Sequence, residues 1–208
     1  VENHHLYDLS SLTKITATLP LIINEVDQNN FELESPMSYL LPELKGSNKS
    51  DLSVKQVLSH YAKLIPWIPF YEKTVDDNGQ PLRKYYRNRE TYRFDISVAE
   101  KLYLKSNFNE KIKEQIIESS LLDSLHYKYS DLPYYLFKDY FERKYRKPLN
   151  YLVQQFLFKP LGLKRTLYNP LNSIPNDEVV PTELDDYFRQ RELRGYVHDM
   201  GAAMQGGV

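Results

Sequence analysis

The sequence has no cysteine, few glycines and no long hydrophobic run. Without cysteine the chain forms no disulfide bond and uses no thiol in catalysis. No apolar run approaches the roughly 18 residues of a bilayer-spanning helix, so we expect no transmembrane segment. The N-terminus lacks the charged and then apolar pattern of a secretory signal peptide. Seven glycines stand against 18 tyrosines and nine phenylalanines, which favours a helix-rich protein with aromatic packing.

The charge balance argues against a nucleic-acid-binding protein. The formal net charge of the 208 residues is −1, with 41% hydrophobic and 26% charged residues, as in ordinary globular domains. A basic aromatic run, Arg83 to Arg93, is flanked by acidic residues, so we interpret it as a solvated insertion. A role of this run in holding an anionic glycan or a peptide carboxylate stays open. Nucleic acid is therefore not an expected partner.

We interpret residues 1–208 as one domain and as part of a longer protein. The length suits one substantial core and is short for two. The chain begins at Val1, without an initiator methionine, and finishes on Gly-Gly-Val after an irregular stretch. The five histidines show no metal-ligand spacing, so we expect neither a metal nor another cofactor.

The clearest pattern lies near the N-terminus, in "YDLSSLTKITATLPLIINEV". Its apolar residues follow helical spacing and predict one buried face: Leu12, Ile15, Leu19, Ile22, Ile23 and Val26. Ser11, Lys14 and Thr18 then fall on a polar stripe at the edge of that face. Pro20 predicts a kink more than one turn beyond Lys14.

Further helices are expected along the rest of the chain. Pro36 suits a helix start, and Ser53 suits the N-cap of a helix that runs to about His60. Residues 72–94 predict a surface excursion. The remaining helical patterns cover about 97–103, about 109–119, a segment from about Leu132 to a break at Lys147–Pro148, and a last segment ending near Gly162.

Ser11 and Lys14 raise the question of chemistry. A serine is a poor nucleophile unless a base lies within hydrogen-bond reach, and a lysine one helical turn later can be that base. The helix N-terminus adds free N–H groups and a positive dipole end for a developing oxyanion. About one Ser-x-x-Lys match is expected by chance in this composition, and there is one, so the pair alone is only a hypothesis.

A second motif strengthens the case. "YDLSSLTKITAT" and the later triplet Tyr129-Ser130-Asp131, with its following helix and the "FKPLGL" ending, resemble two active-site motifs of the superfamily of class C beta-lactamases, penicillin-binding proteins and serine esterases. The resemblance implies an α+β fold. The segment would be mainly the helical layer of a cleft, with most strands of its antiparallel sheet lying outside it. It implies Ser11 as the acylated nucleophile, Lys14 as its proton acceptor or relay and Tyr129 as the general base. Asp131 would take the usual asparagine position and contact Lys14 or substrate.

The substrate is suggested by a branch of this superfamily. "LPELKGSN", "WIPFY", "VVPTELDDYFRQRELRGYVHD" and "GAAMQGGV" are similar to bacterial serine hydrolases linked to cell-wall muropeptide turnover. The resemblance implies an amide or ester substrate, most simply a peptidoglycan-derived muropeptide. It also implies a periplasmic or cell-envelope location and a possible fusion to a glycosidase domain. A carboxylesterase, or a non-catalytic peptidoglycan-binding homologue, are the alternatives.

Three departures from the superfamily pattern stand out. Lys63 in "HYAKL" replaces a usual glycine, so we expect a different local turn. Pro133 follows the Tyr129 triplet closely and is expected to tilt the entry of the next helix. A third motif, His-x-Gly or Lys-Thr-Gly on a cleft strand, is absent. We therefore expect the 208 residues by themselves to hydrolyse poorly, because that strand carries the second oxyanion donor.

Simpler roles exist for each candidate. Tyr129 lies among other tyrosines and could be a packing residue. Asp131 could only cap the next helix. His198 and Asp199 suggest a Ser-His-Asp triad, but Lys14 already supplies a base, so ordering of a loop is the expected role for this pair.

Overall fold

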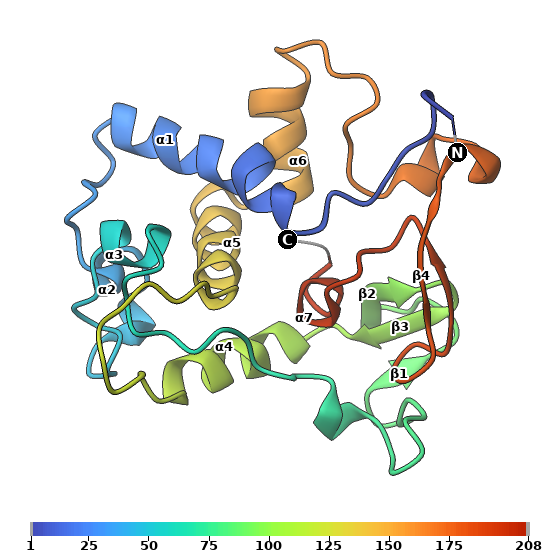
Figure 1. The fold of residues 1–208 in the computed structure, drawn as a ribbon, viewed down its shortest axis with the longest axis horizontal. Coiled ribbons are helices and arrows are strands. Elements are labelled where there is room, and N and C mark those ends of the chain that lie inside the picture. Colours follow the sequence, from blue (N-terminus) through green and yellow to red (C-terminus); the bar gives the residue numbers. More distant parts are fainter. Residues whose placement is uncertain (1, 207–208) are drawn as a thin grey trace. The chain divides into compact units, whose positions relative to one another are not determined.

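The computed structural model describes residues 2–206 and divides into two compact units (Figure 1). Unit 1 comprises Val1–Thr13, Pro69–Glu110 and Phe158–Val208, and unit 2 comprises Lys14–Ile68 and Lys111–Leu157. Both units are therefore built from segments that are far apart in the sequence. The helix α4, Phe108–Glu118, contains one of the boundaries between them.

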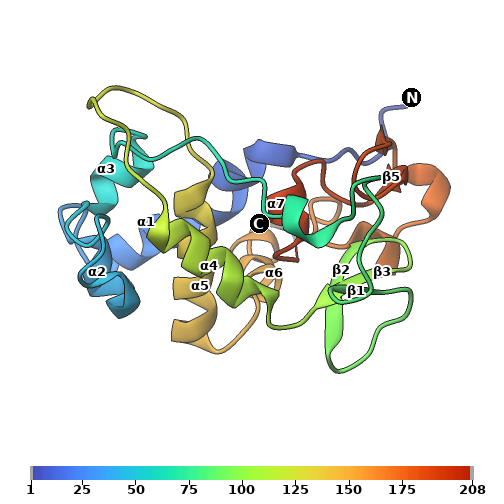
Figure 2. The same ribbon diagram turned by 90° about the horizontal axis from the view of Figure 1, so that it is seen from below.

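Unit 2 is helical. Its helices are α1 (Leu19–Asp27), α2 (Met37–Leu40), α3 (Val54–Leu58), α5 (Leu132–Tyr145) and α6 (Leu149–Val153). The start signals read from the sequence hold, because Pro36 and Pro148 are N-cap residues of α2 and α6. Ser53 forms a full capping box with Gln56 at the start of α3. In Figure 2, α2 and α3 lie side by side at one end of unit 2.

The segment from Ser10 to Asp27 is less regular than its spacing predicts. A 3-10 turn, Ser10–Leu12, is followed by a π-helical turn, Lys14–Thr18, and only then by α1. Pro20 lies in the first turn of α1, where its missing N–H is tolerated. Pro20 therefore lies where the π-helical turn changes into the α-helix.

The predicted buried face is only partly correct, because Ile22 is buried and Leu19 and Val26 are half-buried, but the other three residues are exposed. Leu12, Ile15 and Ile23 are 53%, 56% and 59% exposed, whereas Lys14, Thr18 and Glu25 are buried. Burial of these polar residues is stable because partners compensate for it. The hydrophobic spacing marks a helix correctly, but it does not identify which of the apolar residues are buried.

Glu25 shows how such a polar residue is compensated. Its carboxylate is fully buried and accepts hydrogen bonds from the hydroxyls of Tyr140 and Tyr145, and it pairs with the ammonium of Lys144. Burial disfavours the charged form of Glu25, but these donors outweigh it and lower the pKa of the carboxyl group. Three residues of α5 thus hold α1 at one defined position.

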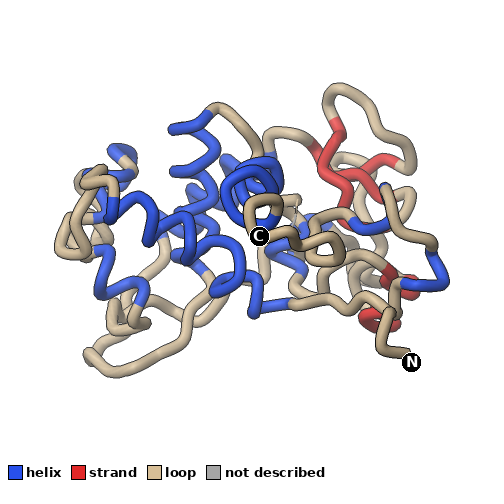
Figure 3. The backbone as a smooth tube through the Cα atoms, turned by 90° about the horizontal axis from the view of Figure 1, so that it is seen from above, coloured by secondary structure: helices blue, strands red, loops and turns tan. Residues whose placement is uncertain are grey.

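Unit 1 carries the strands, which Figure 3 colours red. The strands β1 (Tyr86–Arg87), β2 (Phe94–Ala99) and β3 (Leu102–Lys105) form an antiparallel sheet in the order β1-β3-β2. The helix expected over about 97–103 is therefore wrong, because this range holds the β2–β3 hairpin and its turn. The short helix α7, Met200–Ala203, packs against β2.

A second hairpin joins β4 (Pro181–Asp185) and β5 (Arg191–Arg194) in unit 1. Helical residues outnumber strand residues in the described chain, which has the expected α+β class. No helix within residues 2–206 is both long and apolar enough to cross a bilayer.

Candidate functional site

Lys14 is the centre of a buried polar cluster in unit 2. It begins the π-helical turn that packs against α5, and only 8% of the residue is exposed. Its Nζ lies 2.7 Å from Oδ1 of Asp131. A buried ammonium is costly unless it is paired, so this carboxylate makes the position of Lys14 possible.

Asp131 is free for this pairing because it does not cap its own helix. It occupies the N-cap position of α5, yet its side chain makes no capping hydrogen bond. The hydroxyl of Ser130 accepts the N–H of Leu132 instead, at 3.3 Å. Pro133 lies in the first turn of α5, where a proline N–H is not needed.

Tyr129 lies on the exposed side of Lys14. The Nζ of Lys14 is 5.4 Å from the centre of the Tyr129 ring and forms a hydrogen bond with its side chain. Burial disfavours the ammonium, but the bonds to Asp131 and Tyr129 outweigh it and raise the pKa of Lys14. Lys14 is therefore an ammonium at neutral pH. The Tyr129 residue is 39% exposed and can meet a ligand.

His60 and Tyr134 complete the cluster, and sequence reasoning gave neither of them a role. The His60 ring lies 4.6 Å from the Tyr129 ring, and the Tyr134 ring lies 5.4 Å from Nζ of Lys14. Burial and the nearby Lys14 charge lower the pKa of His60, so its ring is neutral at pH 7. The only sequence signal for His60 is its place in the "HYAKL" motif.

Lys63 adopts a backbone conformation that is rare for residues other than glycine. Its φ is +55°, in the left-handed region that glycine favours, and His60 has a φ of +58°. The conformation that glycine usually supplies is thus adopted here by a lysine. The N–H of Leu122 donates to the carbonyl oxygen of Lys63 at 2.7 Å, and Nζ of Lys63 donates to the carbonyl oxygen of Asp123 at 3.0 Å. These tertiary bonds compensate for the conformational cost.

Ser11 belongs to unit 1, where its residue is exposed in the turn Ser10–Leu12. The preceding Ser10 has a φ of +46°, which a non-glycine residue rarely adopts. The N–H of Ser10 donates to the carboxylate of Asp8 at 2.9 Å and so fixes this backbone. Local strain of this kind often occurs beside a reacting residue.

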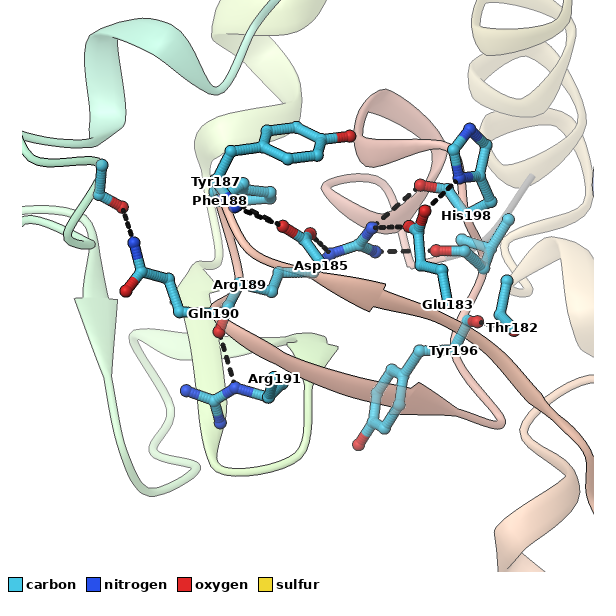
Figure 4. Close-up of polar contacts among 12 residues, drawn as sticks. Thr182, Glu183, Asp185, Tyr187, Phe188, Arg189, Gln190, Arg191, Tyr196 and His198 are labelled. Atoms are coloured by element: carbon cyan, nitrogen blue, oxygen red, sulfur yellow. Dashed lines mark hydrogen bonds and ion pairs between the residues drawn. The ribbon is translucent and has the colours of Figure 1, made fainter.

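His198 and Asp199 order a loop of unit 1. Asp199 caps α7 by accepting the N–H of Ala202. The ring of His198 is bonded to Glu183, which also pairs with the fully buried Arg189 (Figure 4). Arg189 also pairs with Asp185 and donates to the carbonyl oxygens of residues 197 and 198. This network ties the β4–β5 hairpin to the following loop.

Two further features bear on ligand binding, namely the arrangement of metal-ligating side chains and the basic run. Within residues 2–206, no group of three or more His, Cys, Asp or Glu side chains is placed to hold a metal ion. The basic run lies on the surface of unit 1, with Arg83, Arg87 and Arg93 exposed. The guanidinium of Arg87 covers the ring of Phe94 at 4.3 Å, so part of the run's charge serves local packing.

Comparison with known proteins gives the family. The family model described as Beta-lactamase matches residues 1–202. The chain belongs to the beta-lactamase family. A family relative from Salmonella agona, named "Putative D-alanyl-D-alanine carboxypeptidase", is 29% identical over 223 residues. That match covers 98% of this chain and 46% of the relative, so the chain spans about half the length of the curated relatives it matches.

Solved structures of beta-lactamase relatives show the same fold. The beta-lactamase from Sulfitobacter sp. EE-36 matches with a TM-score of 0.57 at 15% identity, over 98% of this chain and 46% of that one. The beta-lactamase/D-alanine carboxypeptidase from Yersinia pestis matches with a TM-score of 0.52 at 20% identity, over 81% and 42%. The expected beta-lactamase-like fold is thereby confirmed.

Proposed function

We propose that this protein is a serine hydrolase that cleaves an amide or an ester through an acyl-enzyme on Ser11. The observation that carries the proposal is the Lys14 ammonium, held 2.7 Å from Asp131 and bonded to the exposed Tyr129. Buried charged groups next to an exposed phenol are costly to keep and are typical of a reaction site.

The reaction follows from these groups. The Oγ of Ser11 attacks the carbonyl carbon while Tyr129 takes its proton as the general base. Collapse of the tetrahedral intermediate breaks the C–N or C–O bond, and Tyr129 returns the proton to the leaving group. Water then attacks the ester of Ser11, loses a proton to Tyr129, and Ser11 leaves with that proton.

The charge of Lys14 favours one of its two expected roles. An ammonium at neutral pH is not a ready proton acceptor, but its charge stabilises negative charge that develops on a neighbouring oxygen during the reaction. We therefore assign proton transfer to Tyr129 and electrostatic support to Lys14. Asp131 keeps Lys14 charged and in place.

The substrate class rests on the relatives. Several of them bear the name of a D-alanyl-D-alanine carboxypeptidase, so a peptide from the cell wall is the substrate we favour. A muropeptide, a cell-envelope location and a fused glycosidase domain stay predictions of the sequence. A simple ester is the alternative substrate.

The test is covalent labelling of the full chain with a fluorophosphonate and with a penicillin-type probe. Mass spectrometry of the digested protein should place the adduct on Ser11. The variant Ser11→Ala should lose labelling, while the matched control Ser10→Ala, one residue away, should keep it. Labelling of another serine, or no labelling of a folded protein, would overturn the proposal. Comparing turnover of a D-Ala-D-Ala peptide with that of a p-nitrophenyl ester then separates the two substrate classes.

A further inference from the structure

The segment that carries Tyr129 and Asp131 is attached to a second segment, residues 60–66. The N–H of Lys128 donates to the carbonyl oxygen of His60 at 2.9 Å, and the N–H of Ser130 donates to Nδ1 of His60 at 3.2 Å. His60 therefore bonds to the backbone on both sides of Tyr129.

Two more bonds continue the attachment. The hydroxyl of Ser130 donates to the carbonyl oxygen of Ile65 at 2.7 Å. The N–H of Asp131 donates to the carbonyl oxygen of Pro66 at 2.9 Å. These two bonds use no side chain of the 60–66 segment. Among these four bonds, the Nδ1 of His60 is the one side-chain acceptor.

We propose that His60 is a positioning residue for Tyr129, acting through Nδ1, which accepts the N–H of Ser130 and fixes the backbone that carries the phenol. The inference rests on the proposed function, in which that phenol moves the proton. Because Nδ1 is the acceptor, the neutral ring carries its proton on Nε2. Contact with the Tyr129 ring, 4.6 Å between centres at 41°, adds a packing constraint.

This role requires the neutral imidazole. A protonated ring has N–H groups at both nitrogens and no acceptor for Ser130. The charged groups that face His60 are Lys14 and Asp131, and the other titratable groups are phenols: Tyr127, Tyr129 and Tyr134. The Lys14 ammonium opposes a second positive charge nearby, while Asp131 favours it. Burial is the largest cause that lowers the pKa of His60, and the Lys14 charge lowers it further. Together they outweigh the effect of Asp131, so His60 stays neutral.

Two variants separate the acceptor from the ring. In His60→Asn an amide oxygen replaces Nδ1 at nearly the same position, and asparagine tolerates the left-handed backbone of residue 60. In His60→Phe the ring remains, but the N–H of Ser130 loses its acceptor. We expect His60→Asn to keep kcat within about threefold of the wild type. We expect His60→Phe to lose on the order of tenfold in kcat with little change in KM, the usual effect of an unsatisfied buried donor.

The pH profile gives a second test. Wild-type kcat should fall on the acid side of the ordinary imidazole pKa as His60 gains a proton, and His60→Asn should lack this component. The control His126→Asn changes an exposed histidine whose ring contacts Ser124, and it should retain the wild-type profile. If His60→Phe fails to fold, this comparison decides alone. Equal kcat in both variants, or an unchanged acid limb in His60→Asn, overturns the proposal.

A measurement without substrate separates this inference from the proposed function. Long-range 1H–15N NMR of the full chain, with His60 assigned through His60→Asn, should show the Nε2-protonated tautomer and a titration below the ordinary histidine range. The Nδ1-protonated tautomer would overturn the role of His60 even if Ser11 is labelled. Conversely, absence of labelling at Ser11 overturns the hydrolase proposal whatever the tautomer of His60.

Discussion

The ion pair between Lys14 and Asp131 makes a prediction about stability that needs no substrate. The side chains of these residues are 10% and 19% exposed, and their charged atoms are 2.7 Å apart. Removing one partner of a buried pair costs about 3–5 kcal/mol of unfolding free energy, because a charge is left uncompensated. Some exposure screens that charge, so we expect about 3 kcal/mol for Asp131→Ala.

The variant Asp131→Asn should be milder. Asparagine keeps an oxygen that accepts from the ammonium and loses only the negative charge, so we expect a cost of about 1.5 kcal/mol. Urea denaturation of the full chain at neutral pH, followed by circular dichroism, measures both values. Asp123→Asn is the matched control, because Asp123 is an exposed aspartate in the same connecting segment whose backbone oxygen, not its carboxylate, binds Lys63.

The pH dependence of this effect has a defined sign. The folded-state pKa of Lys14 is raised above its ordinary value, so the pair stabilises the fold fully below the ordinary lysine pKa. Its contribution is lost as the pH rises through the folded pKa of Lys14. The stability difference between wild type and Asp131→Ala should therefore narrow at strongly alkaline pH. A loss of unfolding free energy below about 0.5 kcal/mol for Asp131→Ala would refute the reasoning. So would a stability difference between wild type and variant that grows at alkaline pH.

Two further predictions concern other residues of unit 2. Tyr129→Phe should fold normally and lose on the order of a hundredfold or more in turnover, because it lacks only the hydroxyl that carries the proton. The control Tyr127→Phe should keep its activity. Near-normal turnover of Tyr129→Phe would return Tyr129 to a packing role. Burial lowers the pKa of Lys49, which donates to the carbonyl oxygens of residues 117 and 119, to about 8. The wild type should therefore gain stability relative to Lys49→Met as the pH rises from about 8 toward the ordinary lysine pKa, and a flat difference in urea titrations would contradict this.

The sequence predicts well those elements that are defined by local signals. Ser53 marks the start of α3, and Pro36 and Pro148 mark the starts of α2 and α6. The apolar pattern over about 109–119 predicts α4. Each of these signals acts within a few residues of the helix end, so no distant contact is needed to read it.

The strands were missed because their turns carry no glycine or asparagine. Lys101 and Gln190 adopt φ values of +53° and +54° in the connections of the two hairpins, which are conformations usually marked by such residues. Strand pairing is also a contact between separate segments, and Val98 and Leu102 mimic helical spacing across the turn. A helix was therefore predicted where β2 and β3 lie.

The sequence predicted only part of the candidate site, because contacts between distant segments cannot be read from local patterns. Ser11, Lys14, Tyr129 and Asp131 were recognised from short motifs, and the structure brings Lys14, Tyr129 and Asp131 together. Their catalytic roles stay predictions. The burial of Lys14 and the part of His60 depend on partners distant in the sequence, and hydrophobic spacing contains no information on them.

The interleaved segments of unit 2 also constrain how a ribosome can deliver this protein. Residues 14–68 leave the ribosome first, but residues 111–157 must emerge before the unit can close. At about 5–20 residues per second, translation of the intervening stretch takes on the order of a few seconds. During that delay Lys14 and Glu25 lack the partners that α5 and Asp131 provide. The nascent chain therefore stays accessible to chaperones and proteases until residues 111–157 have left the ribosome.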